Sequence, residues 1–261
     1  MTTLTSYSQL EHLLTMFSEG VYDLLILEGK AGIGKSRFVQ DFLTENSMYH
    51  YTIGGKITAI HLYEMLYMHQ DALIILDDIP TNSSMTDFWN LLLQLCESTL
   101  VKTLGWKTKG KLSEGIPSSF DTTSRAVLLC NYWSTHSPYA AALQSRGYHA
   151  IFTPGIPEIL EYASGFILEE ILQFFTTYSP LLSTINVRQL HYAQQLLEKG
   201  FDWKLPTIES WNLPANSLSY ILIDVEYPTL TRKEKCELWT TATHKPATVH
   251  QRISDQLEQA A

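Results

Sequence analysis

Apolar runs of strand length alternate with amphipathic segments over the first 155 residues of the chain. The strand-length runs lie at 22–27, 48–53, 72–78, 125–131 and 148–153. The runs at 72–78 and 125–131 include the polar residues that end them. Between them, apolar residues recur three or four positions apart, as on one face of a helix, at 6–17, 37–43, 58–69, 86–95 and 140–146. Strands that are apolar throughout are typical of parallel sheets covered on both faces. The pattern therefore predicts an α/β domain with a parallel sheet over residues 1–155.

The pattern changes near the C-terminal end of the chain. Pro206, Pro214 and the polar segment 210–219 are typical of a linker, and helical periodicity returns at 231–243 and 249–257 around a break at 244–248. Two short helices around a tight turn are similar to a helix-turn-helix. Its second helix carries Thr248, His250, Gln251 and Arg252. A helical hairpin that packs on the rest of the chain or on a partner is the alternative interpretation.

One loop in the α/β region has the full pattern G-x-x-x-x-G-K-[ST]. This phosphate loop consists of Gly29, Lys30, Ala31, Gly32, Ile33, Gly34, Lys35 and Ser36. It follows a predicted strand and precedes a predicted helix that continues from Arg37, which is the context the motif requires. Arg37 is counted with the loop residues as a predicted nucleotide contact. Its backbone N–H groups and the positive end of the helix form an anion site. We expect Lys35 to reach the β- and γ-phosphates and Ser36 to hold Mg²⁺, the alternative being a chance match in a Gly-rich turn.

Polar residues close the third and fourth apolar runs. Asp77 and Asp78 end the run at 72–78, and Asn131 ends the run at 125–131. Ligands of open α/β sheets bind at the carboxyl ends of the strands, so these side chains are expected near the phosphates. Asp77 is predicted to hold Mg²⁺, and Asp78 to orient an attacking water. A strand followed by an Asp-rich turn is the alternative for the two carboxylates.

Composition narrows the functional classes. The 261 residues are 45% hydrophobic and carry a formal net charge of −9, which argues against coating nucleic acid by bulk charge. The scattered residues Cys96, Cys130 and Cys236 fit reduced core thiols better than a metal site or a disulfide framework. No apolar stretch approaches the length of a membrane span, and residues 1–20 lack the features of a signal peptide. We therefore expect a cytoplasmic protein that does not enter the membrane.

A local basic segment, residues 102–111, stands out against the acidic total. It holds four lysines and one Trp and contains no acid. One interpretation is a solvated hairpin tip. The other is a loop that contacts a nucleic-acid backbone through Lys107, Lys109 and Lys111 while Trp106 stacks on a base.

These motifs, in this order and spacing, resemble AAA+ ATPases over residues 6–204. The resemblance implies a P-loop NTPase sheet domain at 1–155, a small helical lid at 156–206, and a linker with a short helical module at 207–261. It implies that ATP and Mg²⁺ are bound, that Asn131 is a water-positioning sensor and that Arg146 is an arginine finger offered to a neighbouring subunit. Arg188 takes the place of a second sensor arginine in the lid. Asp78 departs from the family, because most members have Glu there.

The stretch from Trp106 to Asn131, with Gly115 to Phe120 before the strand, more loosely resembles phage- and plasmid-type replication ATPases. This resemblance implies an ATP-dependent homo-oligomer, with a hexamer as one ring size, that works on DNA as a replication helicase or motor of a mobile element, together with a replication protein partner. A nucleotide-dependent switch or loader that acts on a protein partner is the alternative function. A small-molecule kinase is a further rival, which phosphate transfer to an acceptor would reveal.

Overall fold

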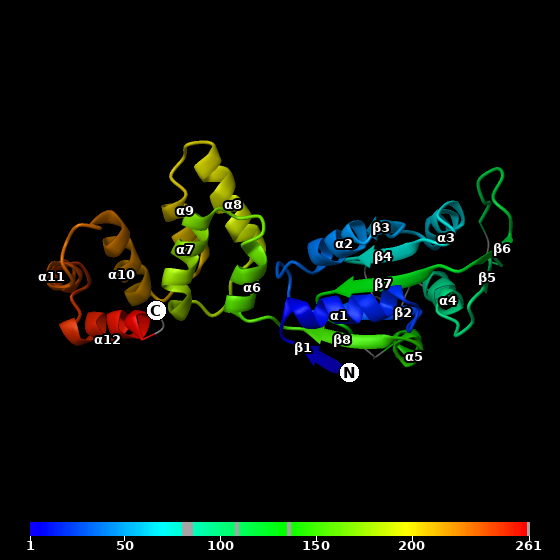
Figure 1. The fold of residues 1–261 in the computed structure, drawn as a ribbon, viewed down its shortest axis with the longest axis horizontal. Helices are drawn as coiled ribbons and strands as arrows, with labels where there is room; N and C mark the ends of the chain where they lie inside the picture. Colours follow the sequence, from blue (N-terminus) through cyan, green and yellow to red (C-terminus); the bar gives the residue numbers. More distant parts are fainter. Residues whose placement is uncertain (80–85, 108–109, 135–136, 260–261) are drawn as a thin grey trace. The chain divides into compact units, whose positions relative to one another are not determined.

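The computed structural model describes residues 1–79, 86–107, 110–134 and 137–259, and the chain divides into two compact units (Figure 1). The first is Met1–Pro154 and the second is Gly155–Ala261. The first unit contains both α and β elements, whereas the second is helical throughout its described part. The α/β prediction is therefore confirmed.

A six-stranded sheet organises the α/β unit. Its order is β1-β8-β2-β7-β4-β3, and every neighbouring pair is parallel. The strands are β1 (Thr2–Leu4), β2 (Leu24–Glu28), β3 (His50–Gly54), β4 (Leu73–Asp77), β7 (Arg125–Cys130) and β8 (Tyr148–Phe152). Because all strands run the same way, the sheet has a carboxyl edge, where the strands end, and an amino edge, where they begin.

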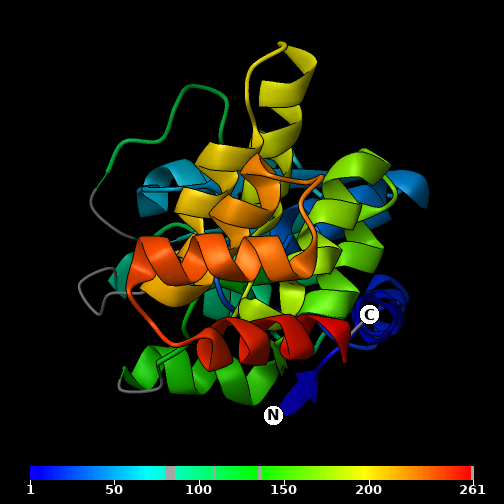
Figure 2. The same cartoon turned by 90° about the vertical axis from the view of Figure 1, so that its left-hand side faces the viewer.

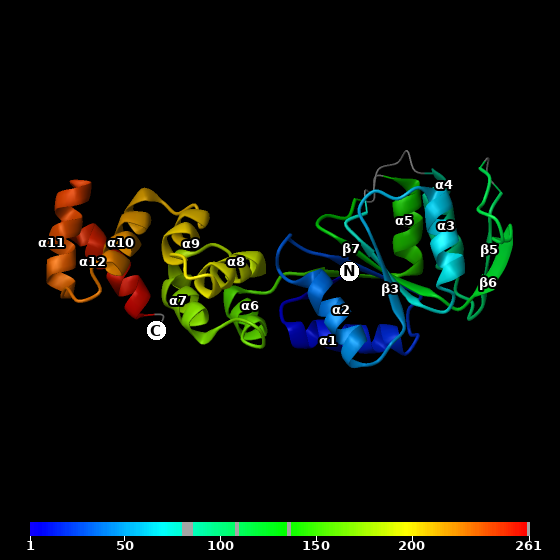
Figure 3. The same cartoon turned by 90° about the horizontal axis from the view of Figure 1, so that it is seen from above.

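Helices cover both faces of this sheet, as Figure 3 shows. The helices α1 (Tyr7–Ser18) and α2 (Lys35–Glu45) lie on one face. On the other are α3 (Ala59–Met68), α4 (Thr86–Leu95) and α5 (Pro138–Arg146). Helix α1 begins where the Ser6 side chain accepts a hydrogen bond from the Gln9 N–H, and its apolar positions are buried. The central strands are buried on both faces, which is why they are apolar except at their ends.

A short antiparallel hairpin is inserted between α4 and β7. It pairs β5 (Lys102–Gly105) with β6 (Ser119–Thr122), and Figure 1 shows it beyond the amino edge of the parallel sheet. The Gln94 side chain accepts from the Gly105 N–H at 2.8 Å, and the Tyr63 hydroxyl donates to the Pro117 carbonyl at 2.9 Å. The loop end of the hairpin is thus fixed to α4 and α3.

The helical unit consists of short packed helices. They are α6 (Ile156–Ala163), α7 (Glu169–Tyr178), the 3-10 turn η1 (Ser179–Leu181), α8 (Val187–Glu198), α9 (Lys204–Ser210), α10 (Ala215–Glu226), α11 (Arg232–Thr243) and α12 (Ala247–Glu258). Figure 2 shows α11 in orange and α12 in red next to one another. Trp239 of α11 is fully buried and donates to the Asn216 carbonyl of α10 at 3.3 Å. Helices α10 to α12 therefore pack on one another.

The interpretation of residues 210–219 as a linker is wrong. Helix α9 ends at Ser210 and α10 starts at Ala215, so most of that segment is helical. The prolines misled because Pro206 lies in the first turn of α9 and Pro214 caps α10. At these positions the missing N–H costs no helical hydrogen bond, so proline begins a helix there. The division into a lid at 156–206 and a module from 207 stays a prediction, and the boundary between the two falls inside α9.

Among the described residues, no helix is both long and apolar enough to cross a membrane.

Candidate nucleotide-binding site

The phosphate loop joins the end of β2 to the start of α2 and turns through two left-handed residues. Gly32 has φ +82° and Gly34 has φ +83°, and a side chain at either position would strain the backbone. A Cβ atom on Gly29 would lie 2.5 Å from the Phe152 carbonyl oxygen. The loop is therefore packed closely on β8 and opens onto the N-terminus of α2, where backbone N–H groups favour an anion.

Lys35 is buried, with 7% of its surface exposed, at the base of this loop. Its Nζ donates to the Gly29 carbonyl at 2.6 Å and to the Lys30 carbonyl at 2.8 Å, and it lies 3.5 Å from Oδ1 of Asn131. The ammonium group is thus held between the phosphate loop and the end of β7. An ammonium group in this position can donate charge-assisted hydrogen bonds to phosphate oxygens.

Ser36 and Asp77 meet across the carboxyl edge of the sheet. The Ser36 hydroxyl donates to Oδ1 of Asp77 at 2.9 Å, although 41 residues separate them in sequence. A hydroxyl and a carboxylate are the hard oxygen donors that Mg²⁺ binds, usually together with waters and substrate phosphates. Among the described residues no cluster of three or more His, Cys, Asp or Glu could hold a metal alone. The pair therefore fits a magnesium ion shared with a nucleotide.

Asp78 and Asn131 are exposed at the same edge. Asp78 has φ +52°, and its N–H donates to the Leu129 carbonyl at 3.3 Å, so the chain turns sharply after β4. Burial, chiefly, and the charges of Glu28 and Asp78 raise the pKa of the Cys130 thiol to about 12, whereas Lys35 lowers it. These charged groups therefore surround the end of β7.

The remaining residues predicted to contact the nucleotide lie in two places. Lys30 and Ala31 are exposed on the phosphate loop, and Arg37 on α2 forms an ion pair with Asp41 at 3.3 Å. Arg188 is exposed in the first turn of α8, in the helical unit, where its N–H donates to the Asn186 side chain at 2.8 Å. The predicted nucleotide contact of Arg188 stays a prediction.

Arg146 lies at the amino edge, away from the phosphate loop of its own chain. It is the last residue of α5, and β8 starts two residues later, beside the start of β2. Its guanidinium donates to the Leu93 carbonyl of α4 at 2.6 Å. The phosphate loop follows the other end of β2, so the role of Arg146 as an arginine finger for a neighbouring subunit stays a prediction.

The basic segment divides into a buried and an exposed part. Lys102, at 1% exposure, forms an ion pair with Asp23 at 2.5 Å. Lys107 and Lys111 are exposed, and Lys109 lies outside the described residues. Trp106 is half-buried against Tyr63, and its Nε1 donates to the Gly110 carbonyl at 3.2 Å. The predicted stacking of Trp106 on a base stays a prediction and would require part of this packing to open.

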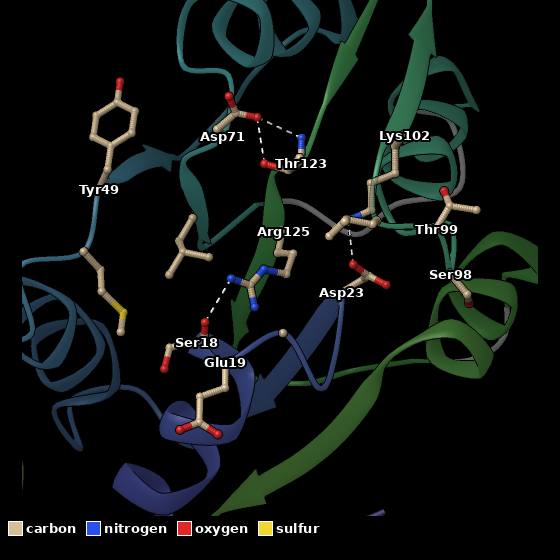
Figure 4. Close-up of a pocket in the computed structure, with 14 residues that line it drawn as sticks. Ser18, Glu19, Asp23, Tyr49, Asp71, Ser98, Thr99, Lys102, Thr123 and Arg125 are labelled. Atoms are coloured by element: carbon tan, nitrogen blue, oxygen red, sulfur yellow. Dashed lines mark hydrogen bonds and ion pairs between the residues drawn. The ribbon is translucent and has the colours of Figure 1, made fainter.

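A separate cleft of about 660 Å³ opens at the amino edge (Figure 4). Arg125 reaches across it to the Phe17 carbonyl and, at 3.0 Å, to the Ser18 carbonyl at the end of α1. Asp71 accepts from the N–H and hydroxyl of Thr123 at 3.0 and 2.7 Å. Figure 4 shows these contacts and the pair of Lys102 with Asp23 as separate interactions around the cleft, each of which joins two segments of the amino edge.

Two features of the site were missed by the sequence analysis. The Tyr7 hydroxyl of α1 donates to the Ile33 carbonyl at 2.6 Å and so supports the phosphate loop from behind. Glu28, the residue before the loop, lies 2.9 Å from Nε2 of His149 in β8. An acid at the end of an apolar strand is a signal that could have identified Glu28. Nothing in the pattern around Tyr7 distinguishes it from an ordinary core residue of an amphipathic helix.

Comparison with known proteins gives structural likeness only. No protein-family profile matches the chain, and no curated protein matches its sequence. Among solved structures, a point mutant of Thermotoga maritima RuvB has a TM-score of 0.48 at 14% identity, covering 92% of this chain and 81% of that one. The Thermotoga maritima RuvB Holliday junction branch migration motor has a TM-score of 0.47 at 14% identity, covering 97% and 86%. A likeness at this level assigns no residue and no activity to this chain.

Proposed function

We propose that this chain is a Mg²⁺-dependent ATPase of the AAA+ type. The observation that carries the proposal is the meeting of Lys35, Ser36, Asp77 and Asn131 at the carboxyl edge of a parallel sheet, linked by the contacts given above. Three separate strands supply or adjoin these groups, and together they offer a cation, two oxygen ligands for a metal and a polar amide. That set is suited to a nucleoside triphosphate and an attacking water.

Each group has a distinct part in the proposed reaction. The loop N–H groups and Lys35 bind the β- and γ-phosphates, while Ser36 and Asp77 hold Mg²⁺. Bound Mg²⁺ neutralises charge on the phosphates. Asp78 accepts a hydrogen bond from water and orients it toward the γ-phosphate, and Asn131 holds the same water or a γ-phosphate oxygen. Asp is shorter than the Glu usual in the family, so slow turnover is expected.

Arg146 requires an assembly in the proposed mechanism. Arg146 lies at the opposite edge from its own phosphate loop, so it acts on the nucleotide of a neighbouring copy, whereas Arg188 acts from the helical unit. An arginine offered in trans is worth roughly 10³ to 10⁵ in rate in comparable systems. The proposed active form is therefore a homo-oligomer that assembles with ATP, a hexamer being one candidate.

Mixing two inactive variants tests the role of Arg146. Lys35→Ala removes the binding cation, and Arg146→Ala removes the finger, so each variant alone is expected to be inactive. In a mixed oligomer, the intact Lys35 site of one subunit meets the intact Arg146 of another, and ATP hydrolysis should return in part. Mixtures that stay inactive, while light scattering shows that the two variants co-assemble, would rule out action in trans.

The proposed work of the motor is on DNA, through the hairpin loop that carries Lys107, Lys109 and Lys111. Lys107 and Lys111 are exposed, as phosphate contacts must be. Replacing each by Ala should reduce the salt dependence of DNA binding by roughly 0.7 to 0.9 log units per lost contact. Lys233→Ala, an exposed lysine of α11, is the matched control. An unchanged slope would remove the loop from DNA binding.

A nucleotide-dependent switch or loader acting on a protein partner is the second candidate. The packing of Trp106 on Tyr63 favours it, because that contact occupies a ring that would otherwise stack on a base. Measuring ATP hydrolysis with and without single- and double-stranded DNA separates the two functions. DNA-stimulated turnover supports the motor, whereas slow, DNA-indifferent turnover with retained nucleotide supports the switch.

A further inference from the structure

A partly buried acid and a buried histidine lie next to the phosphate loop. Glu28 ends β2 immediately before Gly29, and its Oε2 is 2.9 Å from Nε2 of His149. The side chains are 15% and 5% exposed, respectively. Neither has a part in the phosphate, metal or water contacts described above.

Strand register explains why the two side chains meet. His149 pairs with Ile26 of β2, and Glu28 lies two residues further along the same strand. Alternate residues of a strand point to the same face, so both side chains project toward the face covered by α3, α4 and α5. Trp133, two residues after Asn131, packs beside His149 with ring centroids 6.5 Å apart.

The hydrogen-bonding pattern fixes the orientation of the pair. Nδ1 of His149 is buried and has no hydrogen-bond partner among the described residues. A buried donor without an acceptor is costly, so the proton belongs on Nε2, which donates to Glu28. The carboxylate of Glu28 therefore accepts this one hydrogen bond from the His149 ring.

The Glu28 carboxylate adjoins the phosphate loop, because Glu28 is bonded to Gly29, whose carbonyl accepts a hydrogen bond from Nζ of Lys35 at 2.6 Å. Glu28 pairs in register with Cys130, and Asn131 follows Cys130 directly. The Cys130 thiol experiences the charges of Glu28, Lys35 and Asp78 together. A triphosphate bound on Lys35 would therefore lie within the field of Glu28, and like charges in a partly buried site repel.

We propose that Glu28 and His149 form a positioning pair that sets the nucleotide affinity of the site: Glu28 weakens triphosphate binding, and His149 limits that effect. The inference rests on the proposed ATPase function. In this proposal, the pair keeps the affinity for nucleotide below the maximum that the phosphate loop alone would give. The lower affinity allows the nucleotide to leave after each turnover. Both residues act through the phosphate loop and touch neither nucleotide nor water.

Glu28→Gln is the decisive variant. Its side-chain oxygen can still accept from Nε2 of His149, so shape and hydrogen bond are kept while the charge is lost. We expect the KM for MgATP, and the Kd of a fluorescent ATP analogue, to fall roughly three- to tenfold. The value of kcat should stay unchanged or fall slightly if product release limits turnover, because the charge acts on ground state and transition state alike.

Asp23→Asn is the matched control, since Asp23 is the acid of the other buried pair of this unit and lies at the amino edge. It should lower Tm without changing the KM. His149→Leu should raise the KM, and the double variant Glu28→Leu with His149→Leu should bring it back to or below the wild-type value.

The outcomes are distinguishable. If the wild-type protein does not bind MgATP, or if Lys35→Ala leaves MgATP binding unchanged, the proposed function is overturned and this inference with it. If the wild-type protein binds MgATP through Lys35 but Glu28→Gln does not bind MgATP more tightly than the wild type, the inference alone is overturned. The pair of Glu28 and His149 would then have a structural role. If His149→Leu does not fold, Glu28→Gln alone decides the question.

Discussion

Two buried lysines at opposite edges of one sheet differ in what surrounds them. At the carboxyl edge, Lys35 donates to the carbonyls of Gly29 and Lys30 and approaches the Asn131 amide. At the amino edge, Lys102 donates to the carboxylate of Asp23 and to the Ser124 carbonyl. A carboxylate matches the charge of Lys102 inside the chain, whereas dipolar oxygens orient Lys35 next to an anion site. The comparison separates a structural cation from one suited to a ligand, even though both are buried.

The largest expected effect is that of Lys35→Ala. Removing the cation should abolish measurable MgATP binding and reduce turnover roughly 10³-fold or more, since one cationic group on the transferring phosphoryl is worth that much in comparable systems. Equilibrium binding of a fluorescent ATP analogue and single-turnover hydrolysis measure the two effects. Near-normal affinity of this variant for MgATP would contradict the contrast between the two lysines, because Lys35 would then have a structural role like that of Lys102.

Lys102→Met should have the opposite profile. It leaves Asp23 without its partner at a site where the lysine is 1% exposed, and breaking a buried pair costs about 3 kcal/mol or more. Denaturant unfolding should show this loss, while the KM for MgATP of the folded protein stays at the wild-type value. A change in KM larger than the error would show that the amino edge communicates with the nucleotide site.

Tyr7→Phe tests how the phosphate loop is supported at the carboxyl edge. It removes the hydroxyl that donates to the Ile33 carbonyl, which should destabilise the unit by about 1 kcal/mol. Because that contact supports the phosphate loop, we also expect the KM for MgATP to rise severalfold with kcat nearly unchanged. Stability loss without a change in KM would show that the loop keeps its shape without Tyr7.

The smallest effect is expected in the helical unit, away from both lysines. Burial, and secondarily the charge of Arg232, lowers the pKa of His250, which packs between Tyr220 and Trp239. A histidine with a lowered folded-state pKa takes up its proton more readily when unfolded. Its contribution is therefore present above pH 6.5, the ordinary value, and is lost as the pH falls below it. His250→Phe should flatten the pH dependence of Tm between pH 7.5 and 5, and an unchanged slope would contradict this assignment.

His250 also illustrates where sequence patterns stop. The sequence analysis grouped it with Thr248, Gln251 and Arg252 on one candidate recognition helix. The structure buries His250 against α10 and α11 and leaves the other three exposed. The helical period alone does not say which face of α12 is covered, because that depends on where α10 and α11 pack.

Much of the fold and the central site was determined by the sequence alone. Apolar strand runs predicted the parallel sheet, because strands buried on both faces are apolar except at their ends. The spacing of glycines, Lys35 and Ser36 predicted the phosphate loop, because local backbone geometry depends on neighbouring residues. Asp77, Asp78 and Asn131 were predictable as well, since parallel strands end at a common edge.

Only the tertiary structure decided which distant groups meet. The contacts of Tyr7 with Ile33, of Glu28 with His149 and of Lys102 with Asp23 join residues far apart in the chain. The last of these shows that Lys102 does not belong with the exposed Lys107 and Lys111, although all three lie in one basic segment. Pairings of this kind follow from strand order and register, which arise when the whole sheet assembles and which no local pattern contains.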